Sequence, residues 1–449
     1  MSAWESVRAA LATDDVTHLV ACVAALDDAG RREVAAALPG HISAARAQAE
    51  ARLQARERTR RDSAERRSQE RWALFQREAD GRGWTQERRD HEWEAHWQPG
   101  RRLWHEEEEW GDEVAWMELM RVAGAGTLGG PAAVVAWLNR RDLEPWTEQA
   151  DDLEPLLQVL SVRPAAWQAD VAARLVRRAR NARNRNLRLA LELLRANGVT
   201  PPEHDPLVVA WASGAPTARA LRDDPLLPVL LPRLFEAEGV GRALRHEKAA
   251  PLAAGTWLAT LRVLESEGTV SRETLLDGCL RRFLRGGTAT DLRFFARLHD
   301  LIEPAYDEVA ARARDYVRLL PSAPGPVAEL ALRHLRRLGD LPEADVAEAL
   351  GALLSRPERK LATAGLRWLD EAADELDDLD ALAPALGLAF ACGSWDVQCR
   401  AARTAVRHSD RFSPMGAEAV REALPLLPAS VAGSVAQAFG DQALATAGG

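Results

Sequence analysis

Two short motifs in the first quarter of the chain contain residue types that bind metals or transfer protons. The segment HEWEAH, at residues 91–96, resembles the HExxH motif of zinc proteases but holds one residue too many. That motif needs two imidazoles one helical turn apart, whereas side chains five residues apart on an α-helix point about 140° away from each other. Two carboxylates can act as catalytic acid and base only when they lie in different environments. The four exposed glutamates at 106–109 all share one environment. We expect neither a metal site nor a catalytic pair in these motifs.

Other arrangements typical of catalysis are also weak. GAGTLGG, at residues 124–130, has the glycines of a phosphate loop but no following Lys-Ser/Thr and no preceding strand, so close packing between helices explains it better. No Ser/His/Asp or Cys/His combination stands out. His299 and His334 lie on apolar faces of expected helices, which favours packed or surface-lining residues over catalytic bases. We therefore expect no enzymatic activity, no cofactor and no metal.

A run of seven arginines at residues 174–188 has the charge needed to bind phosphates. The segment contains no acidic residue, and it is expected to form one basic helix in which Asn181, Asn184 and Asn186 could add hydrogen bonds to phosphates. The competing interpretation, which we favour, is an exposed Arg-rich face that pairs with the acidic patch at 371–380 or with an acidic partner. The arginines are Arg174, Arg177, Arg178, Arg180, Arg183, Arg185 and Arg188.

Tryptophan and charge are concentrated at residues 44–121. Residues 44–89 hold 13 Arg and 8 acidic residues, whereas residues 90–121 hold 3 Arg and 10 acidic residues. Two antiparallel helical arms of such opposite charge attract each other, so a hairpin that projects from the body is expected. The tryptophans either clamp the two arms together or are offered to a partner. Trp and Arg dominate the energetics of protein interfaces, and the hairpin could bind a protein partner or a second copy of itself. The residues expected to bind the partner are Trp84, Trp93, Trp97, Trp104 and Trp110.

The elements that position these residues are helices. Near the C-terminus, apolar segments with helical spacing recur about every 35 residues, as in stacked helical hairpins. Their alignment gives intervals of 34, 36 and 34 residues between four equivalent positions, which are Arg333, Arg367, Arg403 and Gln437. Near the N-terminus, Gly30, Pro39 and Gly40 are expected to end helices of a small hairpin or cap.

Composition restricts the class of protein. The chain of 449 residues is 47% apolar and 28% charged, as in soluble proteins, and Ala, Leu, Arg and Glu favour helix. A net charge of −9 argues against a surface built wholly for nucleic acid. Four scattered cysteines without a CxxC pair fit a reducing cytoplasm. No signal peptide and no apolar run long enough for a membrane span is found, so we expect a cytoplasmic protein without membrane contact.

Two phrases between residues 120 and 375 resemble a known family pattern. WLNRRDL at 137–143 precedes WQADVAARL at 167–175, and this order is similar to an uncharacterised family of large actinobacterial HEAT-like helical-repeat proteins. Genes of that family resemble neighbours of SWIM zinc-finger and MoxR-type ATPase genes, which implies a component of a multi-protein assembly. The resemblance supplies no active-site residues. The insertion at 44–121 departs from the family pattern.

These patterns together predict an all-α protein: an α-solenoid of HEAT-like helical hairpins with a long charged helical hairpin inserted near the N-terminus. The expected parts are an N-terminal hairpin or cap at 1–43, the projecting insertion at 44–121, helical repeats with the basic helix at 122–206, and the solenoid at 207–449. The leading hypothesis for function is a non-enzymatic scaffold or adaptor for protein partners. The alternative is a nucleic-acid-binding repeat protein of DNA repair or phage defence, which would use the basic helix.

Overall fold

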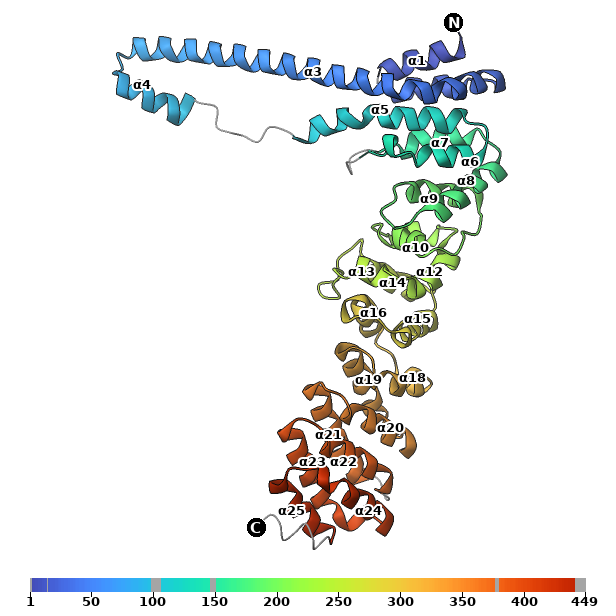
Figure 1. Cartoon of the computed structure of the whole chain (residues 1–449), viewed down its shortest axis with the longest axis vertical. Coiled ribbons are helices and arrows are strands. Elements are labelled where there is room, and N and C mark those ends of the chain that lie inside the picture. The colour runs from blue at the N-terminus through green and yellow to red at the C-terminus, as the bar shows by residue number, and fades with distance from the viewer. Residues whose placement is uncertain (1, 14, 98–105, 146–150, 376–378, 441–449) are drawn as a thin grey trace. The chain divides into compact units, whose positions relative to one another are not determined.

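The chain folds into helices. The computed structural model describes residues 2–13, 15–97, 106–145, 151–375 and 379–440, with side chains at 96–97, 106–114 and 375 excepted (Figure 1). These ranges contain 25 α-helices and no strand, which confirms the predicted all-α class. No helix in the same ranges is both long and apolar enough to cross a membrane. The contacts divide the chain into two compact units, unit 1 (Met1–Glu203) and unit 2 (His204–Gly449).

Unit 1 is built around α5, whose C-terminal half is buried by its neighbours. Leu119, Met120, Val122 and Ala123 of α5 are 3% exposed or less. Helices α1, α2, α3, α6 and α7 all contact α5, and α6 contacts α8, which packs on α9. The bounds are α1 (Ala3–Thr13), α2 (Val16–Ala24), α3 (Asp28–Gly81), α4 (Gln86–Glu92), α5 (Glu106–Thr127), α6 (Pro131–Leu138), α7 (Leu153–Ser161), α8 (Ala165–Arg178) and α9 (Asn186–Asn197).

Helix α3 is 54 residues long and passes through Pro39 and Gly40 without ending. The expected break there is therefore wrong. The apolar residues on both sides of the proline, Val34, Leu38 and Ile42, continue one stripe at helical spacing and are all 7% exposed or less. Burial of this stripe against α1 and α5 outweighs the cost of about 3 kcal/mol that a proline imposes inside a helix.

Unit 2 consists of two rows of helices in which each helix contacts the next in its row. One row follows α12, α15, α18, α20 and α22 to α24, and the other follows α13, α16, α19, α21 and α23 to α25. The bounds are α10 (Asp205–Ala212), α11 (Ala218–Arg222), α12 (Leu227–Glu236), α13 (Val240–Ala243), α14 (Trp257–Ser266), α15 (Arg272–Arg285), α16 (Ala289–Ile302), α17 (Tyr306–Ala310), α18 (Ala313–Leu319), α19 (Gly325–Leu338), α20 (Glu343–Leu354), α21 (Arg359–Glu375), α22 (Ala383–Phe390), α23 (Trp395–Arg407), α24 (Pro414–Ala423) and α25 (Ala429–Ala438).

The repeat alignment is confirmed helix by helix. The four equivalent positions are the ninth residues of α19, α21, α23 and α25. Successive repeats are also joined by exposed ion pairs about one repeat apart, such as Arg336 with Glu371 at 2.5 Å and Lys360 with Glu329 at 2.6 Å. Exposed pairs contribute at most about 1 kcal/mol each. Apolar burial between neighbouring helices is therefore the main source of cohesion in the rows.

Candidate functional site

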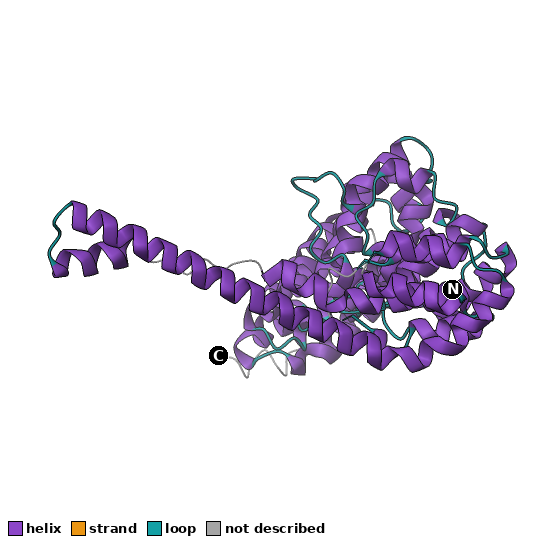
Figure 2. Cartoon of the chain, turned by 90° about the horizontal axis from the view of Figure 1, so that it is seen from above, coloured by secondary structure: helices purple, strands orange, loops and turns teal. Residues whose placement is uncertain are grey.

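The middle of α3 is polar on all sides. Every residue from 54 to 70 is exposed except Ser63, which is partly exposed. A helical stretch of 17 residues spans about 25 Å. We call this stretch the shaft. Figures 1 and 2 show that the C-terminal half of α3 extends away from the other helices of unit 1 and carries α4 at its end.

Beyond the shaft, the chain forms a small aromatic core of its own. We call residues 72–93 the distal knob; it comprises the end of α3, α4 and the first residue of the π-helical turn η1 (Trp93–Trp97). Phe75 is fully buried at its centre, and its ring centroid lies 5.5 Å from Trp72, 6.1 Å from Trp84 and 5.1 Å from Trp93. Trp72 and Trp93 also meet edge to face at 4.6 Å. The knob is thus packed by aromatic contacts that are separate from the core of unit 1.

A tight turn and one arginine hold α4 against α3. Gly83 has a positive φ of 63°, which only glycine adopts at little cost, and the Trp84 amide donates to the Ala79 carbonyl at 3.0 Å. Arg89 then donates to the Gln76 side chain at 3.2 Å and to the Asp80 carboxylate at 2.7 Å. These bonds fix the direction in which the chain folds back, so the knob has a defined surface.

That surface offers the residue types that dominate protein interfaces. Trp72 is 45% exposed and Leu74 is 53% exposed, and because they are two residues apart on α3 their side chains point to opposite sides of the helix. The guanidinium groups of Arg82 and Arg88 lie 5.5 and 5.4 Å from the centre of the Trp84 ring. Exposed apolar groups beside stacked arginines are typical of interface hot spots rather than of catalytic centres.

The predicted partner-binding tryptophans are placed in part. Trp84 and Trp93 lie together in the knob. Trp104, and the side chains of Trp97 and Trp110, fall outside the described residues. The partner-binding set chosen from the sequence missed Trp72 and Phe75, although their spacing with Ala79 at 72, 75 and 79 is the i, i+3, i+7 pattern of a buried helix face.

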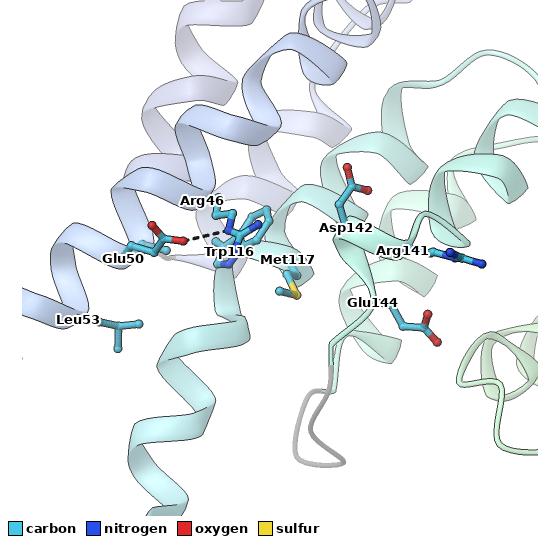
Figure 3. A pocket seen from close by; sticks show the side chains of 9 residues that line it. Arg46, Glu50, Leu53, Trp116, Met117, Arg141, Asp142 and Glu144 are labelled. Carbon is cyan, nitrogen blue, oxygen red and sulfur yellow. Dashed lines mark hydrogen bonds and ion pairs between the residues drawn. The ribbon is translucent and has the colours of Figure 1, made fainter.

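A small pocket lies at the base of the shaft, between α3, α5 and the 3₁₀ turn η2 (Arg141–Leu143) (Figure 3). Its volume is about 360 Å³. Arg46 pairs with Glu50 on α3 at 2.9 Å, with Trp116 beside them, and Arg141, Asp142 and Glu144 stand on the opposite side. The charges of both signs are spread around the rim instead of converging on one point, so the pocket has the features of a shallow contact groove and not those of a reaction centre.

The basic segment does not form a single helix, and this prediction is corrected. Helix α8 ends at Arg178 and α9 begins at Asn186, with a loop between them. The asparagine side chains are used inside the protein: Asn181 accepts from the Arg183 amide at 3.0 Å, and Asn184 accepts from the Asn186 amide at 3.0 Å. These bonds stabilise turns, which is the usual role of Asn in loops.

The ends of the arginine run have protein partners. Arg174 pairs with Asp170 at 2.8 Å and Arg188 lies 3.8 Å from Asp151. Arg185 binds the buried Asp152 at 3.0 Å. Four exposed arginines remain at the corner between α8 and α9, and no ion pair is found for them among the described residues: Arg177, Arg178, Arg180 and Arg183.

Asp152 belongs to a buried polar cluster that the sequence did not reveal. Arg121 is 1% exposed and donates to Asp152 at 2.5 Å, to the Leu138 carbonyl at 2.7 Å and to Asn186 at 2.7 Å. Burial, with the negative charge of Asp152 as the next cause, raises the pKa of the neighbouring Glu118 to about 7. The cluster ties α5 to the ends of α6, α7 and α9, which is a structural role.

The glycine-rich segment and the acidic motifs have simpler outcomes. GAGT is the last turn of α5, and a Cβ at Gly124 would lie 2.1 Å from the Trp137 indole nitrogen. The interpretation of GAGTLGG as close helix packing is confirmed. The side chains of His96 and of the glutamate run at 106–109 fall outside the described residues. His299 and His334 are buried in unit 2.

Comparison with protein families, curated proteins and solved structures returns no match to this chain. The candidate site is accordingly defined by its own geometry, an aromatic knob at the end of a polar helical shaft.

Proposed function

We propose that the chain is a non-enzymatic adaptor in a bacterial multi-protein assembly, and that the distal knob captures a protein partner. The observation that carries this proposal is the separation of two packed regions by the shaft. A polar helix of about 25 Å adds no apolar burial of its own. Holding Trp72 and Leu74 at its end is useful when the contact must be made at a distance from the body.

The chemistry of the knob suggests the kind of partner. Trp72 and Leu74 are exposed on opposite sides of α3, so they fit a partner that wraps around the end of the helix, and the arginines over Trp84 can extend the contact to carboxylates of that partner. The two helical rows of unit 2 are an extended surface of the type that repeat proteins use for binding, and they would hold further components. The four cysteines are unpaired, which supports a location in the reducing cytoplasm.

The test is capture of partners by the tagged full-length chain from its own cells, with nuclease added to half of each sample. We expect reproducible protein partners that survive nuclease and are lost with Leu74→Glu, which changes an exposed position without entering the knob core. The matched control is Val162→Glu, which introduces the same charge at an apolar side chain of unit 1 that is 49% exposed and lies outside the knob. Equal recovery with Leu74→Glu and wild type would contradict the proposal.

A second function, binding of nucleic acid, is favoured by one observation. Arg177, Arg178, Arg180 and Arg183 are exposed at one helix corner, where they can neutralise phosphates. If these arginines neutralise phosphates, a plot of the logarithm of the affinity for nucleic acid against the logarithm of the salt concentration falls with a slope of about 3 to 4. Replacement of all four arginines by Glu then removes binding. Partners lost on nuclease treatment would support this function over the adaptor.

A further inference from the structure

Two buried histidines and a carboxylate meet where α16 packs on α19 in unit 2. His299 is fully buried and His334 is 4% exposed, and their ring centroids are 5.0 Å apart with the rings at 67°. Asp300 follows His299 on α16. One ligand atom from each of the three residues lies within 4.8 Å of the other two.

The ring nitrogens of this pair are incompletely used. His299 shares a hydrogen bond of 2.8 Å between Nε2 and the Tyr316 hydroxyl, whereas its Nδ1 is buried without a partner. Both ring nitrogens of His334 are buried without a partner. A buried nitrogen that bonds to nothing is costly, and native proteins rarely retain one without a reason. A ligand common to the two rings would use one nitrogen from each of them.

We propose that His299, His334 and Asp300 bind a divalent transition-metal ion, with Zn²⁺ as the best fit. Imidazole nitrogens with one carboxylate oxygen are a donor set that suits Zn²⁺, and three protein ligands leave a fourth position open. Ligand atoms around a tetrahedral Zn²⁺ are about 3.4 Å apart, because each bond is about 2.1 Å long. The three side chains must therefore approach one another by up to about 1.4 Å, which rotation about side-chain bonds supplies.

The surrounding residues orient the ligands in the manner of outer-sphere partners. Tyr316 occupies Nε2 of His299, so Nδ1 is the nitrogen of this ring that remains available to a metal ion. Arg333 donates to Oδ1 of Asp300 at 2.5 Å and leaves the second carboxylate oxygen for the metal. Metal-binding histidines and carboxylates usually have such partners, which fix their direction.

The protonation state also suits a metal. Burial, followed by the positive charges of Arg333 and Arg337, lowers the pKa of His334 to about 4. Burial, followed by His334, Arg333 and Arg312, lowers the pKa of His299 to about 3. Both imidazoles are therefore neutral at pH 7 and have a lone pair for a metal ion without first losing a proton.

An open pocket of about 370 Å³ borders the cluster and gives it access to solvent. Asp300 and His334 form part of its lining, together with Glu303, Pro304, Arg333 and Arg337. A metal ion held between Asp300 and His334 would adjoin this pocket, so water or a small anion can complete its coordination. The two arginines would favour a carboxylate or phosphate group as that anion. This inference does not depend on the adaptor function, which rests on unit 1.

The test is Zn²⁺ binding to the purified full-length chain after treatment with a chelator, measured by competition with a chromophoric chelator. Wild type should bind one Zn²⁺. Asp300→Asn and His334→Gln should each bind it at least about tenfold more weakly. Tyr316→Phe should weaken binding about tenfold through the orientation of His299 alone. Co²⁺ in place of Zn²⁺ should give visible absorption bands in wild type that Asp300→Asn abolishes.

The matched control is His408→Gln, because His408 is another histidine of unit 2 that is 6% exposed and, among the described residues, belongs to no group of three possible metal ligands. It should bind Zn²⁺ as wild type does. Asp300 is half exposed, so Asp300→Asn leaves the packing intact even if His334→Gln unfolds the helix pair. Wild-type affinity in Asp300→Asn, or no Zn²⁺ uptake by wild type in the micromolar range, would overturn the inference.

Discussion

Mild acid should destabilise the helix pair α16–α19 of metal-free protein, because its two histidines fold in the neutral form. Their ordinary pKa is 6.5, and in the folded protein it is lowered to about 3 for His299 and about 4 for His334. The unfolded chain therefore binds two protons as the pH falls through 6.5, whereas the folded chain does not. Stability from this source is complete above pH 6.5 and is lost as the pH falls toward 4.

The magnitude follows from the same pKa values. Between pH 7 and pH 5, protonation of an unfolded histidine with a pKa of 6.5 favours the unfolded state by about 2 kcal/mol. Two such groups give an upper value of about 4 kcal/mol. His334 lines an open pocket, where solvent and small shifts of the ring relieve part of its desolvation. We therefore expect a loss of about 2 to 4 kcal/mol in the free energy of local unfolding.

Hydrogen exchange measured by mass spectrometry at pH 7 and pH 5, after correction for the intrinsic rate, reports this free energy for peptides of α16 and α19. His334→Gln should reduce the pH dependence by about half, because one of the two titrating groups is gone. His246→Gln, at an exposed position outside both helices, should leave it unchanged. Equal protection of α16 and α19 at the two pH values, or the same pH dependence in His334→Gln, would refute the reasoning.

Three further predictions test the packing of unit 1. Phe75→Ala removes the side chain at the centre of the knob, and such a truncation in a packed core lowers the free energy of unfolding by about 3 to 5 kcal/mol. Hydrogen exchange should show loss of protection in the knob, while the melting temperature of the whole chain stays constant. Arg121→Met leaves buried acceptors unpaired and should cost about 3 to 5 kcal/mol in urea unfolding of unit 1. Gly124→Ala should cost about 1 to 3 kcal/mol in the same assay because its Cβ would overlap Trp137, whereas Gly129→Ala, which meets no atom within 4 Å, should be neutral.

The repeats were predictable because their signal is both local and periodic. Each repeat needs an apolar stripe at helical spacing, and equal repeats must place equivalent residues at equal intervals. The positions of Arg333, Arg367, Arg403 and Gln437 therefore aligned correctly before any contact was known. The knob was predictable in part, because tryptophan density marks an unusual surface but does not show which ring is at the centre.

The errors arise where packing overrides a local rule. Pro39 is a helix breaker by local chemistry, yet the buried stripe around it keeps α3 continuous. The run around Arg180 has the composition of a helix, yet Asn181 and Asn184 cap turns there and the chain breaks into a loop. Arg185 was expected on a surface and instead compensates the buried Asp152, a partner that lies 33 residues away.

The histidine cluster was missed because its members are 35 residues apart, on different repeats. That distance is itself a signal, since it equals the repeat length, and stacked repeats bring equivalent positions of neighbouring helices together. In a repeat protein, polar residues one period apart should be examined as one site. His299 and His334 meet this condition, with their ring centroids 5.0 Å apart.

The charge pattern of the shaft bears on where a partner would bind. Glu57 lies 3.9 Å from Arg61, and Asp62 precedes Arg66 at the same four-residue spacing, with the acidic residue first. Pairs in this order each stabilise a solvent-exposed helix by about 0.2 to 0.5 kcal/mol. Much of the Arg and Glu content of α3 thus has a use in keeping an exposed helix folded. A partner that bound along the shaft would have to displace the Glu57–Arg61 pair, whereas covering the exposed apolar side chains of the knob is favourable. Binding energy should therefore be concentrated at Trp72 and Leu74.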